Sequence, residues 1–220
     1  MRWILKGILK ATILAAAVYG SALSAAQSTE QAYQATVNMF GKGPGNGSGV
    51  FISSTKILTA KHVSDHLKVN GVAVLQTGET FEIVKVDSAP TLDVAVVTVK
   101  GEYKGEPITP ACTTVNTLSL LGYYGNPVGL TYAGPFIINP IHGVSHSIHA
   151  PKGVIFFQGV ALPGASGSGI IDEKGNVVGV MTTGMDAAAG EGPIKVPTGI
   201  GGFVPLADPE ACDFIKKELQ

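Results

Sequence analysis

The hexapeptide Gly164-Ala165-Ser166-Gly167-Ser168-Gly169 is the most informative segment of this chain. Half of it is glycine and Pro163 precedes it, which excludes a helix interior, because glycine costs about 1 kcal/mol relative to alanine there. Glycine allows backbone angles that other residues avoid and lets two chain segments approach closely. A serine in such a loop can present its hydroxyl beside backbone N–H groups, as an acyl-transfer nucleophile requires. Taken alone, however, glycine–serine loops are mostly turns or linkers.

The composition describes a packed chain with many turns. Its 220 residues are 45% hydrophobic and carry a formal net charge of −1, which suits one or two folded domains. The near-neutral balance gives no electrostatic reason to expect a nucleic-acid partner. Only 14% of the residues are charged, whereas 29 are glycine and 13 are proline, a combination that favours short strands joined by loops.

The first 26 residues have a different character. Three basic residues lie among the first ten, Ala11 to Leu23 is apolar, and Ser24-Ala25-Ala26 is typical of a cleavage site. This pattern predicts a secretory signal peptide over residues 1–26 and a mature chain that is secreted or periplasmic and free of the membrane. An uncleaved anchor is the alternative, although the apolar run is shorter than the roughly 20 residues of a spanning helix.

Short apolar runs separated by turn residues predict strands along the mature chain. In the first half there are six of them: Tyr33 to Phe40, Val50 to Ile52, Ile57 to Ala60, Val72 to Gln76, Thr80 to Val86 and Val94 to Val99. The glycine-rich segment Gly41 to Gly49 is expected to be a loop. Six strands at this spacing indicate a closed antiparallel barrel. After a linker rich in glycine and proline, the second half repeats the pattern at Leu118 to Gly125, Val154 to Phe157, Gly169 to Ile171, Val177 to Thr182 and Ile200 to Val204.

The last residues predict a helix of about three turns. Asp208 suits the N-cap and Pro209 the first helical position. Apolar residues then recur at helical spacing, at Ala211, Phe214, Ile215 and Leu219.

Two further residues could activate a serine, which is a poor nucleophile at neutral pH without a base beside it. His62 directly follows the apolar run Leu58-Thr59-Ala60, at the rim of a rigid element, where a general base is expected. Asp93 begins the apolar run Val94 to Val97, and a carboxylate there could orient the imidazole. Considered alone, Asp93 is better explained as an ordinary strand-end residue.

Four segments in this order resemble the chymotrypsin-like (trypsin-like) serine proteases. They are Gly47-Ser48-Gly49-Val50-Phe51-Ile52, Leu58-Thr59-Ala60-Lys61-His62, Asp93-Val94-Ala95-Val96 and the glycine–serine hexapeptide. The order His, Asp, Ser matches this family and differs from the orders of subtilisins and α/β-hydrolases. The resemblance covers about residues 33–220, with loops as short as those of bacterial and viral members.

The resemblance implies an all-β fold of two six-stranded antiparallel β-barrels with a C-terminal α-helix, and a site in the cleft between the barrels. We accordingly expect the first barrel over residues 27–100, a linker over 101–111, the second barrel over 112–207 and the helix over 208–220.

The same resemblance implies an exported serine endopeptidase that acts on polypeptides and needs no metal or cofactor. His62 would be the base and then the acid, Asp93 would orient it, and Ser166 would form the acyl-enzyme. Backbone N–H groups of Gly164 and Ser166 would form the oxyanion hole. Ser168 is the alternative nucleophile, but the family pattern requires glycine two residues before the serine and directly after it, which favours Ser166.

Substrate-binding residues are also implied by the resemblance. Val160 would lie at the base of the first specificity pocket, and Thr182, Thr183 and Gly184 would line its wall. Because Val160 offers no charge to pair with a charged side chain, we expect cleavage after uncharged residues.

Several readings remain open on the sequence alone. Cys112 and Cys212 could form a disulfide in an exported protein or could be two buried thiols. The histidines His142, His146 and His149 have a spacing that could suit a metal, although a solvated loop is the simpler explanation.

Ala165 stands where animal digestive members have an aspartate that pairs with a new N-terminus, so that mode of activation is not expected. A catalytically inactive two-barrel binding module is the alternative function, and the oligomeric state stays undetermined.

Overall fold

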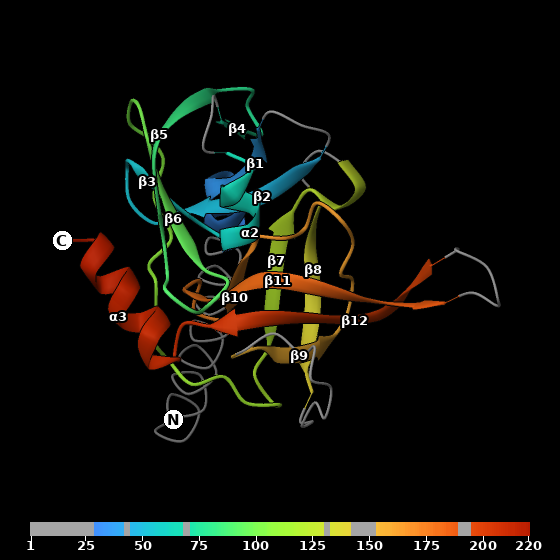
Figure 1. The fold of residues 1–220 in the computed structure, drawn as a ribbon. Helices are drawn as coiled ribbons and strands as arrows, with labels where there is room; N and C mark the ends of the chain where they lie inside the picture. Colours follow the sequence, from blue (N-terminus) through green and yellow to red (C-terminus); the bar gives the residue numbers. More distant parts are fainter. Residues whose placement is uncertain (1–28, 42–44, 68–70, 130–132, 142–152, 189–194) are drawn as a thin grey trace, which may run out of the picture.

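The computed structural model describes residues 29–41, 45–67, 71–129, 133–141, 153–188 and 195–220. Strands dominate these residues and form two closed barrels of six antiparallel strands each (Figure 1). The all-β fold expected from the sequence is therefore confirmed. The segment 1–26 and the histidines His142, His146 and His149 lie outside the described residues.

The first barrel is built from the strands between residues 36 and 99. They are β1 (Thr36–Phe40), β2 (Asn46–Phe51), β3 (Lys56–Thr59), β4 (Val72–Leu75), β5 (Thr80–Ser88) and β6 (Ala95–Val99). Their order around the barrel is β1-β2-β3-β6-β5-β4, and β1 closes the ring by pairing with both β2 and β4.

Two local features of this barrel differ from the sequence-based expectation. Residues 29–35 are helical, so only Thr36–Phe40 of the expected first strand is a strand. Ala32 and Ala35, one helical turn apart, are both buried, and a short run of alternating residues could not distinguish this face from a strand. In addition, β2 begins at Asn46 inside the expected glycine loop. The side chain of Val63 occupies the space where a Cβ at Gly47 would lie, so the strand tolerates only glycine there.

The second barrel is built from the strands between residues 121 and 205. They are β7 (Leu121–Gly125), β8 (Ala133–Pro140), β9 (Ile155–Gln158), β10 (Gly169–Asp172), β11 (Val177–Ala188) and β12 (Lys195–Pro205). Their order is β10-β11-β12-β9-β8-β7. The β11–β12 hairpin extends well beyond the other strands (Figure 1). Strand β8 was missing from the expected set because it contains two prolines, which usually mark the absence of a strand.

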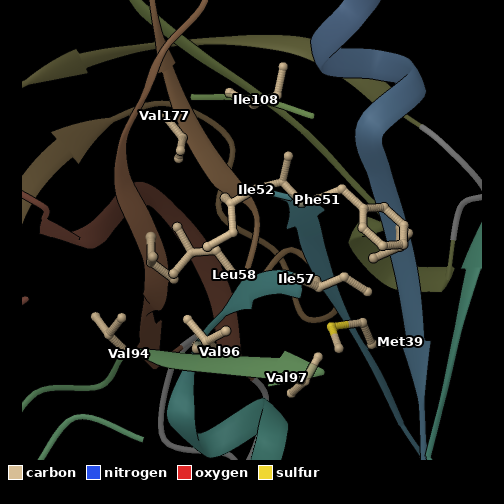
Figure 2. Packing of buried hydrophobic residues seen from close by; sticks show 14 of the residues in the cluster. Met39, Phe51, Ile52, Ile57, Leu58, Val94, Val96, Val97, Ile108 and Val177 are labelled. Atoms are coloured by element: carbon tan, nitrogen blue, oxygen red, sulfur yellow. The ribbon is translucent and has the colours of Figure 1, made fainter. Parts of the chain in front are cut away.

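The apolar core of the first barrel continues into the interface with the second. Phe51, Ile57 and Leu58 are fully buried inside the first barrel. Val177 of β11 and Ile108 of the connecting segment belong to the same buried cluster (Figure 2). The second barrel has its own smaller cluster, which comprises Leu121, Tyr123, Ile138, Phe157, Ala165, Ile170, Val178, Met181 and Phe203. Because apolar contacts cross the interface, the two barrels hold one another in a defined orientation.

The chain ends in helix α3 (Pro209–Glu218), as predicted. The Asp208 side chain caps it by accepting a hydrogen bond from the Glu210 N–H at 2.9 Å. A disulfide joins Cys212 of α3 to Cys112 in the segment that connects the two barrels, which selects the bonded alternative for these cysteines. None of the helices in the described part of the chain has the length and hydrophobicity needed to cross a membrane.

Candidate active site

His62 lies at the rim of the first barrel because the chain turns from a strand into a short helix there. Ala60 has an extended backbone (φ −80°, ψ 146°), and helix α2 (Lys61–Asp65) follows directly after β3. His62 is the second residue of this helix, and 45% of its side chain is exposed. The imidazole is thus held by a rigid element yet open to solvent and ligands.

Asp93 contacts His62 through both of its carboxylate oxygens. Its Oδ2 lies 2.7 Å from Nδ1 of the ring, and its Oδ1 accepts a hydrogen bond from the His62 backbone N–H at 2.9 Å. The contact follows from the sheet, since β3 ends and β6 begins beside one another where Thr59 pairs with Ala95. Two bonds to one carboxylate set the ring orientation and favour the tautomer with its proton on Nδ1, so Nε2 is left as the basic nitrogen.

Ser166 lies in the tight turn that precedes β10, and glycines on either side of it permit the turn. Gly164 has φ +94° and Gly167 has φ +87°, both in the region that side chains rarely adopt. A Cβ at Gly164 would overlap the carbonyl oxygen of Asn126, and one at Gly167 would overlap that of Ser48. The turn therefore packs directly against backbone from both barrels.

The amide groups of this turn divide into two sets. Those of Ala165, Gly167 and Ser168 donate to backbone carbonyls at 2.7 to 3.1 Å. Among the residues that the structure describes, those of Gly164 and Ser166 have no acceptor. These two amides are the pair expected to bind an oxyanion, and they are the ones left available for it.

His62, Gly164 and Ser166 line one cavity of about 280 Å³ between the barrels. The other lining residues come mainly from the first barrel and are Met39, Gly41, Gly45, Asn46, Gly47, Val63, His66, Leu67 and Pro163. The residues that carry the candidate base, hydroxyl and two amides therefore line one space that a small part of a ligand can occupy, and Met39, Val63 and Leu67 add apolar residues to its lining.

The two serines of the hexapeptide differ in burial. Ser166 is half-buried, whereas Ser168 is fully buried. The Ser168 hydroxyl finds no hydrogen-bond partner among the described residues, and it lies where a side chain on Gly125 would be. A hydroxyl enclosed in this way cannot meet a substrate, so the geometry favours Ser166 as the reactive serine.

The comparison with protein families identifies the fold family. The model for the trypsin-like peptidase domain matches residues 47–180, which include all of the site residues from His62 to Ser166. The chain belongs to the trypsin-like peptidase family. The family resemblance noted in the sequence is thus confirmed.

Two relatives of this trypsin-like peptidase show how far the likeness extends. It is 26% identical over 203 residues to exfoliative toxin A of Staphylococcus aureus, covering 78% of this chain and 68% of the toxin. It is 31% identical over 176 residues to HhoA of Synechocystis, named as a serine protease, covering 76% of this chain and 42% of that protein. The match thus spans about two fifths of the length of HhoA.

Solved structures share the fold of this trypsin-like peptidase. Rv3671c of M. tuberculosis H37Rv superposes with a TM-score of 0.66 at 19% identity, over 86% of this chain and 89% of that one. The HtrA-type protease AlgW, in a structure with a tripeptide, superposes with a TM-score of 0.71 at 22% identity, over 90% of this chain and 64% of that one.

The residues predicted to bind substrate lie on the second barrel of this trypsin-like peptidase. Val160 is 38% exposed, and its carbonyl accepts a hydrogen bond from the Tyr123 hydroxyl at 2.9 Å. Thr182 is buried, while Thr183 is half-buried and Gly184 is exposed. A Cβ at Gly184 would approach the carbonyl of Ala161, so β11 lies against the chain next to Val160. The assignment of these residues to a specificity pocket stays a prediction.

Sequence reasoning assigned no role to the polar residues behind the turn at residues 164–168. Ser48 and Asn126 are fully buried, and Ser48 hydrogen-bonds to the turn from the first barrel. The signal was present for Ser48, which lies between two glycines in a quoted family segment, but its partners Asn126 and Gly164 lie 78 and 116 residues away. No group of three or more His, Cys, Asp or Glu side chains in the described ranges is arranged to hold a metal ion.

Proposed function

We propose that this protein is an exported serine endopeptidase in which Ser166 is the nucleophile, His62 the general base and Asp93 the residue that orients it. The observation that carries the proposal is the two-point contact between Asp93 and His62 beside a cavity that Ser166 and Gly164 also line. Membership of a peptidase family supports the same conclusion.

The proposed reaction starts with attack of Ser166 Oγ on the carbonyl carbon of a peptide bond, while Nε2 of His62 accepts the hydroxyl proton. The carbonyl oxygen becomes an oxyanion that accepts hydrogen bonds from the N–H groups of Gly164 and Ser166. His62 then gives the proton to the leaving amine, the C–N bond breaks and an acyl-enzyme remains. Water, activated by His62, hydrolyses the ester and restores Ser166.

The direction of proton transfer indicates which part of the substrate the cavity receives. The leaving nitrogen must lie next to His62 to take up its proton, so the leaving peptide extends on the His62 side. Met39, Val63 and Leu67 line the cavity there, which suits an apolar side chain after the cut bond. The side chain before the cut bond would contact Val160, Thr182, Thr183 and Gly184 on the second barrel, with uncharged residues preferred.

Covalent labelling with a fluorophosphonate tests the proposed function. The wild-type protein should be labelled on Ser166, and Ser166→Ala should not be labelled. Ser168→Ala is the matched control and should be labelled as fast as wild type, because Ser168 is buried away from the cavity. A folded wild-type protein that neither reacts with the probe nor cleaves a mixed peptide library would contradict the proposal and favour the inactive binding module.

A further inference from the structure

Ser48 of the first barrel holds the turn at residues 164–168 of the second barrel, here called the nucleophile turn, through two separate hydrogen bonds. Its hydroxyl donates to the carbonyl of Gly164 at 2.8 Å, and its backbone N–H donates to the carbonyl of Ser166 at 2.8 Å. The two bonds grip the turn on either side of Ala165. The backbone on both sides of the reactive serine is thus fixed by a residue more than 100 positions earlier in the chain.

Asn126 orients the Ser48 hydroxyl. Its backbone N–H and its side-chain Nδ2 both donate to Ser48 Oγ, at 3.0 and 3.2 Å, so the hydroxyl must direct its own proton to Gly164. The side-chain Nδ2 also lies 3.4 Å from the carbonyl of Val37 in β1. Asn126 therefore connects the end of β7, the first barrel and the nucleophile turn in one buried network.

The turn that follows Asn126 contributes a further hydrogen bond to the nucleophile turn. The N–H of Val128 donates to the carbonyl of Pro163 at 2.6 Å. That carbonyl belongs to the same planar peptide unit as the Gly164 N–H, and in a trans peptide the two point in opposite directions. Holding the Pro163 carbonyl on the far side therefore turns the Gly164 N–H away from it. Val128 makes this bond from φ +49°, an unusual angle for a β-branched residue.

Neither Ser48 nor Asn126 can touch a substrate, since both side chains have no exposed surface. A buried polar network is favourable only when its members are satisfied, and an apolar pair would fill this space without directing any carbonyl. Together these bonds hold the carbonyls of Pro163, Gly164 and Ser166, so the peptide units on both sides of the Ala165–Ser166 unit are fixed. The Gly164 and Ser166 amides have no acceptor among the described residues.

We propose that Ser48 and Asn126 are positioning residues for the oxyanion hole, and that they act by fixing the peptide units around Ser166 from the opposite barrel. This inference rests on the proposed function. It assigns the two residues to the rate of the chemical step rather than to substrate binding. The peptide units that Ser48 holds, Gly164–Ala165 and Ser166–Gly167, adjoin the two units that carry the oxyanion amides, and neither buried side chain can reach a substrate.

Fluorophosphonate kinetics separate these effects. The probe loses fluoride as Ser166 Oγ bonds to phosphorus, and its phosphoryl oxygen occupies the oxyanion hole during the reaction. For Ser48→Ala and Asn126→Ala we expect the maximal labelling rate to fall about 10- to 100-fold, somewhat less than the loss of a whole oxyanion donor. The probe concentration at half-maximal rate should stay within about twofold of wild type, because binding outside the oxyanion hole is unchanged.

Thr36→Val is the matched control. Thr36 is also buried in the first barrel, and its hydroxyl donates to the carbonyl of Ala32 at 2.8 Å, away from the nucleophile turn. It should leave the labelling rate unchanged and lower the melting temperature less than Ser48→Ala does, because Ser48→Ala breaks three hydrogen bonds of a buried hydroxyl and Thr36→Val breaks one. Ser48→Ala removes only one oxygen atom, so it reports on the network even if Asn126→Ala fails to fold.

The outcomes are distinguishable. If folded Ser48→Ala is labelled as fast as wild type, this inference is overturned and the proposed function stands. If Ser48→Ala and Thr36→Val lose the same share of the labelling rate, this inference is also overturned, because the loss then follows stability alone. A wild-type protein that is not labelled would refute the proposed function, and this inference with it.

Discussion

Single glycines decide whether the two barrels can meet at the nucleophile turn. Gly167 has φ +87°, and a Cβ there would overlap the Ser48 carbonyl and the Thr59 hydroxyl. Those two groups are themselves bonded, since Thr59 Oγ1 donates to the Ser48 carbonyl at 2.7 Å. The requirement for glycine directly after Ser166 is thus both conformational and steric, and neither part can be relieved by moving a flexible side chain.

Gly167→Ala should lower the free energy of unfolding by about 2–5 kcal/mol, because it adds backbone strain and overpacking at the same position. Gly78→Ala is the matched control, since Gly78 also has φ +87° but no atom lies within 4 Å of its added Cβ. It should cost only about 1–2 kcal/mol. Urea unfolding of the two variants measures the difference, and equal losses would show that steric overlap contributes nothing.

Ser168→Ala should leave the free energy of unfolding unchanged or raise it by up to about 1 kcal/mol, because a buried hydroxyl without a partner is unfavourable. The Ser168 hydroxyl has no hydrogen-bond partner among the described residues. Thr36→Val, which removes a bonded buried hydroxyl, should instead cost about 1 kcal/mol. A lower melting temperature for Ser168→Ala than for Thr36→Val would contradict this assignment.

At the scale of elements, helix α3 supports the segment that carries Asp93. The carboxylate of Glu210, in the first turn of α3, accepts hydrogen bonds from the backbone N–H of Thr91 at 2.6 Å and of Leu92 at 3.2 Å, and from the Thr91 hydroxyl. Lys56 of β3 contacts the other end of the helix at Glu218. The helix thus bridges β3, which His62 follows, and the segment before β6 that carries Asp93.

Glu210→Gln should lower the free energy of unfolding by about 1–3 kcal/mol, since hydrogen bonds to a charged acceptor are stronger than neutral ones. The turnover rate should fall as well, because the chain just before Asp93 loses its support. Glu102→Gln is the control: among the described residues Glu102 pairs with Lys104, both side chains are exposed, and such surface pairs contribute little to stability. Peptidase assays and urea unfolding of both variants test this. Unchanged turnover in Glu210→Gln would contradict the claim that α3 helps to position Asp93.

The disulfide should contribute about 2–5 kcal/mol to stability, because it closes a loop of 100 residues in the unfolded chain. The double variant Cys112→Ser, Cys212→Ser should therefore unfold at lower urea concentration, with a changed slope if the unfolded state expands. Wild type treated with a reductant should match the double variant. If the reductant does not change the unfolding of wild type and mass spectrometry finds both cysteines as free thiols, the disulfide does not form in solution.

At the scale of the whole molecule, three buried tyrosines set an alkaline limit to stability. Burial raises the pKa of Tyr103, Tyr123 and Tyr124, and nearby Glu106 and Glu30 raise that of the first and the last further. A folded-state pKa above the unfolded value of about 10 means that the neutral phenol is favoured in the folded protein. This stabilisation is complete below about pH 10 and is lost as the pH rises above it.

These tyrosines should consequently leave the urea midpoint unchanged below about pH 10 and make it fall as the pH rises further. Tyr123→Phe should be slightly less stable at pH 8, because it loses the bond to the Val160 carbonyl, but should lose less stability on further alkalinisation. The comparison therefore uses the change with pH rather than the absolute midpoint. An identical alkaline loss in wild type and Tyr123→Phe would exclude Tyr123 as a contributor.

Local sequence was sufficient for much of this protein. Alternating apolar residues, turn glycines and the cap at Asp208 act over a few positions, so the all-β character and helix α3 could be predicted before any contact was known. The positions of His62, Asp93 and Ser166 could be proposed from segments in order. The helical residues 29–35 and strand β8 could not, because short alternating runs and prolines are ambiguous without their neighbours.

The resemblance of four segments, in this order, to one protease family implied the family, the two-barrel fold and the candidate nucleophile, base and carboxylate. Only the tertiary structure decided which distant groups meet. The Asp93 carboxylate contacts the backbone N–H and the ring Nδ1 of His62, Ser48 and Asn126 lie behind the nucleophile turn, and Cys112 is bonded to Cys212. The physical reason is that these contacts join residues from about 30 to more than 100 positions apart. Their geometry is set by strand pairing within each barrel and by how the two barrels and the C-terminal helix pack, which no local pattern of residues encodes.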